Sequence, residues 1–219
     1  LAGFSDDHQR LCLSLAVWNG RDPILKERLF GLTNAEGNHG EDVKEVYFYV
    51  DATPTHSYMK AVYKYPQSKF PYEQLTSENR KRNRQQTELE LRDLGAFDRQ
   101  NYFDCVIEYA KNSPNDILIR ATIHNRGAQP AAIHVLPQWW FRNTWTWDCT
   151  HEGCAPKPTI RWQDEHLVAM HATLDKWLMR SDVTSDGERP VYLFTDNETN
   201  PQRHPEVPTS GEEFFKDAF

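Results

Sequence analysis

A polar loop near the start of the chain holds the residue types most able to do chemistry. Its carboxylate, amide and imidazole side chains are Asn34, Glu36, Asn38, His39, Glu41 and Asp42. Carboxylates and a histidine this close in sequence can act as a general acid and base, and their oxygens can also bind a hard cation. The same side chains can instead satisfy the backbone of their own turns, which Gly37 and Gly40 make tight. The string matches neither an EF-hand nor a zincin motif, so we expect no metal site.

A tryptophan-rich segment is the second candidate. Its aromatic members are Trp139, Trp140, Trp145 and Trp147, and its polar members are Arg142, Asn143 and Asp148. Sugar rings stack their C–H faces on aromatic side chains, and their hydroxyls need planar polar partners. Alternatively, the tryptophans fill the core, since alternation along a strand sends neighbouring side chains to opposite faces. The residues predicted to contact substrate are therefore the loop set with Arg142, Asn143, Trp145 and Trp147, and no residue is predicted to be catalytic.

Two strands after the polar loop are expected to position it. Residues 46–50 and 58–65 each alternate in side-chain character with period two, as strands do. Between them, residues 53–55 (Thr-Pro-Thr) break the pattern, because proline cannot donate to a strand ladder. The pattern predicts a hairpin that presents the preceding loop as a ligand-facing surface.

The remaining pattern is mostly β. Strands are expected over residues 10–19, 102–110, 117–123, 131–140, 167–173, 176–180 and 190–195, with an edge strand around Leu89 and Leu91. The three strands between 102 and 140 have turn signals at regular spacing and are expected to be adjacent and antiparallel. Residues 71–84 predict a short surface helix in which Leu75 is nearly the only apolar interior residue. The class is therefore all-β, an antiparallel β-sandwich with one short helix.

Composition and charge exclude several classes of protein. The 219 residues carry a net charge of −7, with a mean hydropathy of −0.77, and 12% of them are aromatic. The one basic run, residues 80–84, lies among glutamates and is expected to be a solvated helix face or a linker, so no nucleic-acid partner is predicted. No apolar run is long enough to span a membrane, so no membrane partner is expected.

The cysteines and the chain ends give two further expectations. Cys12 and Cys105 lie in strand patterns and are expected to be free thiols. Cys149 and Cys154 could close a small loop or, with His151, bind a metal, although their spacing matches no standard zinc pair. Free thiols are typical of cytoplasmic proteins, so a cytoplasmic location is expected for this protein. Both termini are expected to be internal points of a longer protein, with residues 1–195 forming an N-terminal β-sandwich domain and residues 196–219 a loop or linker.

Several stretches of the chain resemble a known family. They are residues 27–45 (ERLFGLTNAEGNHGEDVKE), 51–60 (DATPTHSYMK), 119–125 (IRATIHN) and 136–145 (LPQWWFRNTW). They are similar to large bacterial glucosidase-like proteins related to glycoside hydrolase family 63, the group that includes the mannosyl-oligosaccharide glucosidase of the eukaryotic endoplasmic reticulum. The resemblance covers most of the chain and weakens after Asp148.

The resemblance implies an architecture and a role. Such proteins carry an N-terminal β-sandwich of the supersandwich type ahead of an (α/α)6 barrel, and two carboxylic residues of the barrel catalyse hydrolysis with inversion. The chain is similar to the sandwich only, so its expected role is to support the barrel, and its partners are that barrel and an oligosaccharide or small glucoside. No cofactor is implied. The alternative is a stand-alone carbohydrate-binding module.

Overall fold

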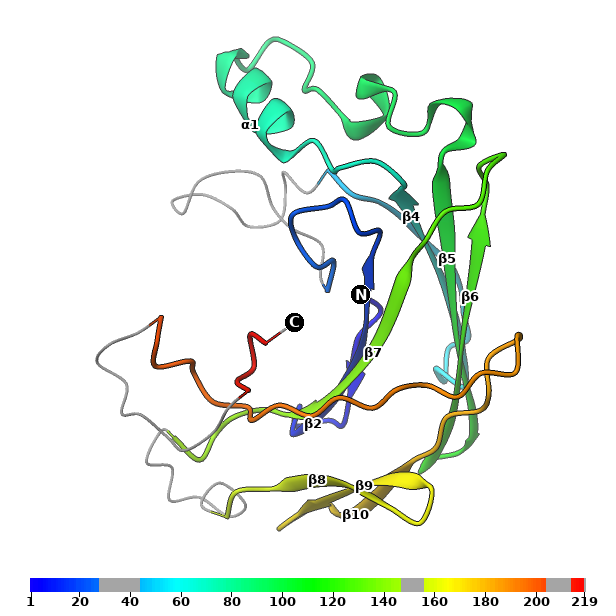
Figure 1. The fold of residues 1–219 in the computed structure, drawn as a ribbon, viewed down its shortest axis with the longest axis vertical. Helices are drawn as coiled ribbons and strands as arrows, with labels where there is room; N and C mark the ends of the chain where they lie inside the picture. Colours follow the sequence, from blue (N-terminus) through cyan, green and yellow to red (C-terminus); the bar gives the residue numbers. More distant parts are fainter. Residues whose placement is uncertain (28–43, 147–155, 204–213, 219) are drawn as a thin grey trace. The chain divides into compact units, whose positions relative to one another are not determined.

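The fold is described by a computed structural model that covers residues 1–27, 44–146, 156–203 and 214–218. In these ranges the chain is mostly β, with three antiparallel sheets and a single α-helix (Figure 1). The predicted all-β class with one short helix is therefore confirmed. The chain divides into two compact units: unit 1 contains residues 1–3 and 14–138, and unit 2 contains residues 4–13 and 139–219.

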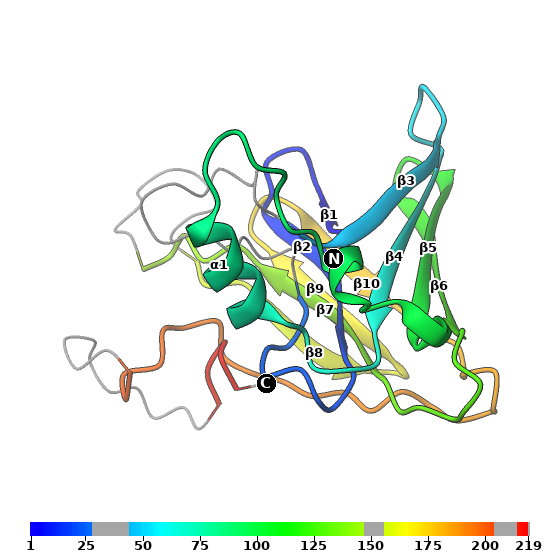
Figure 2. The ribbon, with the colours of Figure 1, turned by 90° about the horizontal axis from the view of Figure 1, so that it is seen from above.

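Unit 1 contains a four-stranded sheet in the order β3-β4-β5-β6, which Figure 2 shows side by side. The strands are β3 (Val46–Ala52), β4 (Tyr58–Pro66), β5 (Tyr102–Ser113) and β6 (Asp116–Asn125). The predicted hairpin is the β3–β4 pair. Its turn is closed by the Thr53 amide, which donates to the Tyr58 carbonyl at 3.0 Å. Tyr47 pairs with Tyr63, and Tyr63 with Cys105, so one row of side chains crosses three strands.

One face of the two inner strands forms a core. The buried residues on it are Tyr63, Tyr65, Phe103, Cys105, Ile107 and Tyr109. Apart from Pro66 and Asp104, which are also buried, their neighbours along β4 and β5 are more exposed, as a strand with one buried face requires. Burying each large apolar side chain contributes about 1.5–3 kcal/mol, so this row is a principal source of the unit's stability.

The helix α1 (Tyr72–Lys81) confirms the helix predicted over residues 71–84, with Pro71 just before its first turn. Leu75 is completely buried and packs with Phe70 and Leu91 in a small apolar cluster. The predicted basic run is exposed, from Arg80 to Arg84. A solvated helix end is therefore confirmed.

The edge strand predicted around Leu89 and Leu91 is wrong. Residues Leu91–Leu94 form a short 3-10 helix, η1, and Asp98–Gln100 form a second, η2. Leu91 turns inward to the cluster with Leu75, and the side chains of Glu90 and Asp93 cap η1 reciprocally. The alternation of leucines with charged residues around Leu89 and Leu91 therefore belongs to a capped 3-10 turn and not to a strand that pairs in a sheet.

A second sheet has the order β1-β2-β7, with β1 (Phe4–Ser5), β2 (Leu11–Trp18) and β7 (His134–Phe141). The strand predicted over residues 10–19 is confirmed. The expectation that residues 131–140 pair with the two strands before them is wrong, because β7 lies in a different sheet from β5 and β6. The Asn125 side chain explains the departure: it accepts from the Gly127 amide and donates to the Gln129 carbonyl, which ends the ladder in a turn.

Unit 2 contains a three-stranded sheet in the order β10-β9-β8, with β8 (Thr159–Gln163), β9 (His166–His171) and β10 (Asp175–Met179). β9 and β10 confirm two predicted strands, and the sequence analysis missed β8. The strand predicted over residues 190–195 is wrong, since no strand is present there. Val191 and Leu193 are mostly exposed, and the Trp162 and Tyr192 rings pack at 4.5 Å between centroids.

Unit 2 also has its own apolar core. Leu11, Phe141 and Ala169 are buried, and Trp139, Trp145, Ile160, Leu174 and Trp177 pack against them. The packing interpretation of the tryptophans therefore holds for Trp139 and for the body of Trp145. Among the described residues, no helix is long and apolar enough to cross a membrane.

Candidate functional site

The polar loop and part of the tryptophan segment lie outside the described residues. The loop residues concerned are Asn34, Glu36, Asn38, His39, Glu41 and Asp42, and the tryptophan is Trp147. Cys149 and Cys154 lie outside them too. What the structure does describe is the pair of chain segments that enter and leave the loop, ending at Glu27 and beginning at Lys44. The site is therefore built from these anchors and from the described part of the tryptophan segment.

A buried ion pair joins the two sides of the loop. Lys26 Nζ lies 2.5 Å from Glu45 Oε1, and the two side chains are 0% and 1% exposed. The Tyr63 hydroxyl donates to the other Glu45 oxygen at 2.6 Å, so both carboxylate oxygens are satisfied. The Lys26 ammonium also contacts the Tyr72 hydroxyl and lies 4.1 Å from the Phe70 ring centroid. The chain before residue 28 is thereby tied to the chain after residue 43.

Asp22 extends this arrangement into a network. Its Oδ2 accepts hydrogen bonds from the hydroxyls of Tyr65 and Tyr72, at 3.1 and 3.2 Å. Asn19 fixes the turn before it, because its side-chain oxygen accepts from the Asp22 amide and its side-chain nitrogen donates to the Pro66 carbonyl at 2.7 Å. We call Asp22, Lys26, Glu45, Tyr63, Tyr65 and Tyr72 the buried polar network.

The electrostatics of this network point to anchoring. Burial raises the pKa of the Glu45 carboxyl, although the charge of Lys26 and the hydrogen bonds from Lys26 and Tyr63 act in the opposite direction. Burial, together with the Glu45 charge, also raises the pKa of Tyr63 well above its ordinary value. The carboxylates of the network have partners within it, and their side chains are removed from solvent. The network is therefore suited to holding the chain in place rather than to binding a substrate.

Lys44 provides a second anchor at the end of the undescribed loop. Its side chain is 4% exposed, and its ammonium contacts Glu88 and lies 3.3 Å from Glu90 Oε1. Burial lowers the pKa of Lys44, but hydrogen bonds to the two glutamates outweigh burial and the pKa lies above its ordinary value. Lys44 is therefore charged at neutral pH and binds the start of β3 to the segment before η1.

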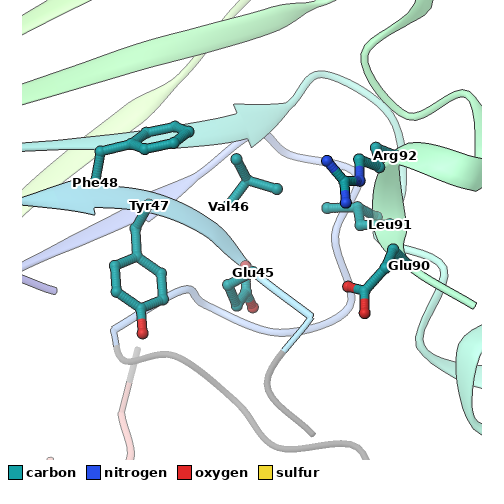
Figure 3. Close-up of a pocket in the computed structure, with 7 residues that line it drawn as sticks. All are labelled: Glu45, Val46, Tyr47, Phe48, Glu90, Leu91 and Arg92. Carbon is teal, nitrogen blue, oxygen red and sulfur yellow. The ribbon is translucent and has the colours of Figure 1, made fainter. Parts of the chain in front are cut away.

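A groove of about 230 Å³ lies between the start of β3 and η1 (Figure 3). Its walls are Glu45, Val46, Tyr47, Phe48, Glu90, Leu91 and Arg92. In Figure 3 the Arg92 guanidinium points toward Val46, while Glu90 lies on the opposite side of Leu91. Among the described residues, no hydrogen bond or ion pair involves the Arg92 side chain. The groove therefore combines apolar walls with a cation that has no partner in the described part of the chain.

The described part of the tryptophan segment forms a polar cluster in unit 2. Trp145 Nε1 donates to Glu198 Oε1 at 2.5 Å, and Asn143 Nδ2 donates to the Asn197 carbonyl at 2.7 Å and to Glu198 Oε2 at 3.2 Å. Two residues predicted to contact substrate, Asn143 and Trp145, are therefore brought together by one carboxylate. These hydrogen bonds occupy Asn143 Nδ2 and Trp145 Nε1, the donor atoms with which the two side chains would bind a sugar hydroxyl.

Lys157 completes this cluster. Its ammonium lies 2.9 Å from Asp196 Oδ1 and 3.3 Å from Glu198 Oε1, and 5.8 Å from the Trp145 ring centroid. Burial lowers the pKa of Lys157, but its hydrogen bonds to both carboxylates outweigh burial and raise it. We call Asn143, Trp145, Lys157, Asp196 and Glu198 the tryptophan cluster.

Arg142, the remaining predicted contact residue, stands apart from this cluster. Its side chain is exposed, and no described residue forms a hydrogen bond with the guanidinium. Its backbone amide donates to the Arg10 carbonyl at 2.9 Å, which fixes the strand end and leaves the side chain unconstrained. The structure therefore separates Arg142 from Asn143 and Trp145, although they are close in sequence.

Sequence reasoning missed three members of the tryptophan cluster and the whole buried polar network. Glu198 is 53 residues from Trp145, inside a segment predicted to be a linker, and no spacing rule connects them. Lys26 and Glu45 offered a weak signal, because both flank the polar loop that the sequence singled out. The region contains many other charged residues, so the sequence did not indicate that these two form an ion pair.

Burial raises the pKa of both described cysteine thiols. Cys12 and Cys105 are free thiols, as predicted. Burial raises the pKa of Cys105 to about 12, so its thiolate is scarce at neutral pH. Within the described ranges, no group of three His, Cys, Asp or Glu side chains is placed to hold a metal ion.

Comparison with known proteins shows that the chain is similar to a yeast protein. The chain is 40% identical, over an alignment of 248 residues, to the Saccharomyces cerevisiae protein named "Uncharacterized protein YMR196W". The alignment covers 100% of this chain and 23% of the yeast protein, so the chain spans about a quarter of that relative's length. No family model matches the chain. No solved structure matches it.

Proposed function

We propose that this chain is the non-catalytic β part of a longer glycoside hydrolase of the α-glucosidase type. In this role it supports an (α/α)6 barrel that carries two catalytic carboxylic residues and hydrolyses oligosaccharides or small glucosides with inversion. The chain itself contributes no catalytic residue. It borders the sugar pocket through the polar loop of residues 34–42 and through the tryptophan segment. We place the whole protein in the cytoplasm, consistent with the free thiols of Cys12 and Cys105.

The observation that most supports this role is the extent of the match to the yeast relative. The similarity runs through the whole chain but takes in only 23% of the longer protein. An all-β region that corresponds to one part of a long polypeptide is what the sequence resemblance implies. The buried polar network is consistent with this role, because Lys26 and Glu45 hold the two sides of the conspicuous polar loop together.

A stand-alone carbohydrate-binding module is the second candidate, and the tryptophan cluster favours it. Trp145 is half-buried, and its ring nitrogen is fixed by Glu198, so the ring is held in one orientation. A fixed indole is the feature on which a sugar ring stacks. In this case the isolated chain would bind maltose or similar glucosides by itself.

The deciding experiment is the mass and sequence of the native gene product, followed by assay of that product. We expect a product several times larger than 25.6 kDa that hydrolyses α-glucosides and releases the β-anomer first, as NMR would show. Glu36→Ala and His39→Ala in the whole protein are then expected to lower activity or sugar affinity. A native product that ends near Phe219 would contradict the hydrolase role. Quenching of tryptophan fluorescence by maltose, absent in Trp145→Ala, would then support the binding module.

A further inference from the structure

The turn that follows strand β2 contains a chemically labile dipeptide, Asn19-Gly20. It is the only Asn-Gly pair in the sequence. Asparagine is a thermolabile residue, because the nitrogen of the next peptide group can attack its side-chain carbonyl carbon. A glycine in the next position favours this attack, since it has no Cβ to obstruct the carbon and its backbone is freer than that of other residues. Asn19 is therefore the asparagine of this chain that reacts fastest on an unfolded backbone.

The folded chain holds both polar atoms of the Asn19 side chain. The oxygen accepts from the Arg21 amide at 2.9 Å and from the Asp22 amide at 2.8 Å. The nitrogen donates to the Pro66 carbonyl at 2.7 Å and to the Ser68 carbonyl at 2.9 Å. The residue is only 6% exposed. The nitrogen that would leave in the reaction is the donor of two of these bonds, so the reaction requires this set of hydrogen bonds to open.

The chemistry at Asn19 needs no reagent other than water. The Gly20 amide nitrogen forms a bond to the Asn19 side-chain carbon, the bond from that carbon to Nδ2 breaks, and the NH2 group leaves as ammonia with the amide proton. The product is a succinimide ring. Water then adds at either carbonyl carbon of the ring and opens it to an aspartate or an isoaspartate. Both products lack the NH2 group, and isoaspartate also reroutes the main chain through the former side-chain carbon.

Loss of this NH2 group removes a connection between two parts of unit 1. Pro66 is the last residue of β4, so Asn19 joins the turn after β2 to the end of β4. An aspartate in its place brings a carboxylate against two carbonyl oxygens, and a buried charge without a partner is costly. The same turn positions Asp22, which accepts hydrogen bonds from Tyr65 and Tyr72 in the buried polar network. The modified chain therefore also loses support for that network.

We propose that Asn19-Gly20 is a self-modification site that the fold keeps closed and that unfolding opens. A chain that unfolds briefly refolds unchanged. A chain that stays unfolded deamidates at Asn19, and the product no longer folds with the original stability. Unfolding thus becomes irreversible at one residue. This inference concerns the chain alone and does not depend on the proposed function.

The first test compares deamidation of the 219-residue chain in buffer and in urea, at the same mildly alkaline pH. Trypsin releases residues 11–21, a peptide in which Asn19 is the only asparagine, for mass spectrometry. We expect deamidation at least ~100-fold faster in urea, because in buffer only the small population with this turn open reacts. In urea, Gly20→Ala is expected to slow it at least ~10-fold, since a Cβ then obstructs the attack. Equal rates at Asn19 in buffer and in urea would overturn the proposal.

The second test asks whether the modified chain refolds. Samples are withdrawn from urea at intervals and diluted into buffer, circular dichroism gives the refolded fraction, and limited proteolysis separates folded from unfolded chains. We expect the refolded fraction to fall as Asn19 deamidates, and the protease-resistant chains to carry unmodified Asn19. The test uses the unaltered sequence, so it does not depend on a variant that folds. Deamidated chains that refold to the original urea midpoint would contradict the proposal.

The third test introduces the aspartate directly, with Asn83→Asp as the matched control for Asn19→Asp. Asn83 is exposed, and its side-chain oxygen accepts from the Gln85 amide at 2.9 Å. Both substitutions keep such an acceptor, but only Asn19→Asp removes a donor to two carbonyls. It is expected to lower the urea midpoint by at least ~1 M, and Asn83→Asp by less than ~0.3 M. Equal midpoints for the two variants would also overturn the proposal.

Discussion

Replacing Lys26 by methionine is expected to destabilise the chain severely. The side chain is completely buried, and its ammonium lies 2.5 Å from Glu45. Methionine keeps most of the volume and removes the charge, so Glu45 is left as a buried carboxylate without a counter-ion. Breaking a buried pair in this way costs about 3–5 kcal/mol. Against a typical total stability of about 5–15 kcal/mol, this is a large fraction.

The assay is urea unfolding of the single and double variants, each followed by circular dichroism. Lys26→Met with Glu45→Gln is expected to be more stable than the sum of the two single effects by at least ~2 kcal/mol, because the unpaired charge is absent. Lys81→Met removes a lysine from the exposed pair with Glu78 and is the matched control. It is expected to change the free energy of unfolding by less than about 0.5 kcal/mol.

The pH dependence gives an independent check. In Lys26→Met, burial without the counter-ion raises the pKa of Glu45 in the folded state above its unfolded value. The folded state then holds a proton that the unfolded state releases, so stability falls as pH rises from the unfolded pKa to the folded one. The variant is therefore expected to lose more stability at pH 8 than at pH 5. A cost below about 1 kcal/mol, strictly additive with Glu45→Gln and independent of pH, would refute this reasoning.

Three further outcomes are expected. Burial raises the pKa of the Asp104 carboxyl, but the hydrogen bonds that it accepts from Lys64 and Arg126 outweigh burial, and the pKa lies below its ordinary value. The ionised carboxylate therefore stabilises the folded chain at pH values above the unfolded-state pKa, and this stabilisation is lost as pH falls through the folded-state pKa. The difference in unfolding free energy between the native chain and Asp104→Asn should thus narrow from pH 7 to pH 3. Gly95→Ala should cost about 1–2 kcal/mol in chemical unfolding, because Gly95 has φ +67° and a Cβ there would meet Asp98 Oδ2 at 2.6 Å. Glu198→Gln should lower the midpoint of heat unfolding, followed by tryptophan fluorescence, by about 2–4 °C, since Trp145 loses a charge-assisted hydrogen bond of roughly 1 kcal/mol.

Local patterns predicted individual elements better than they predicted partners. The alternation over residues 46–50 and 58–65 located the β3–β4 hairpin, because successive side chains of a strand point to opposite faces and so give a period-two pattern in the sequence. The same alternation could not show that β7 leaves the sheet of β5 and β6, since the Asn125 turn contacts decide that. Around Leu89 and Leu91, a capped turn and an edge strand gave the same alternation.

The candidate site was less predictable than the fold. Asn143 and Trp145 could be singled out by residue type, yet the carboxylate that joins them comes from Glu198, far along the chain. Lys26 and Glu45 pair across 19 residues, and their burial depends on Tyr63 and on the helix region around Phe70. Such pairs are fixed by the tertiary fold, so no spacing rule could have identified them.

The distance in sequence between Trp145 and Glu198 has a consequence for synthesis of the chain on the ribosome. Translation proceeds at about 5–20 residues per second, so the 53 residues between them take about 3–10 s to add. For most of that interval the indole nitrogen and Lys157 have been synthesised, but the carboxylates of Asp196 and Glu198 have not. The interval between the synthesis of Lys26 and that of Glu45 is about 1–4 s, because only 19 residues separate them. Of these two contacts, the one between Trp145 and Glu198 therefore stays incomplete longer on the nascent chain.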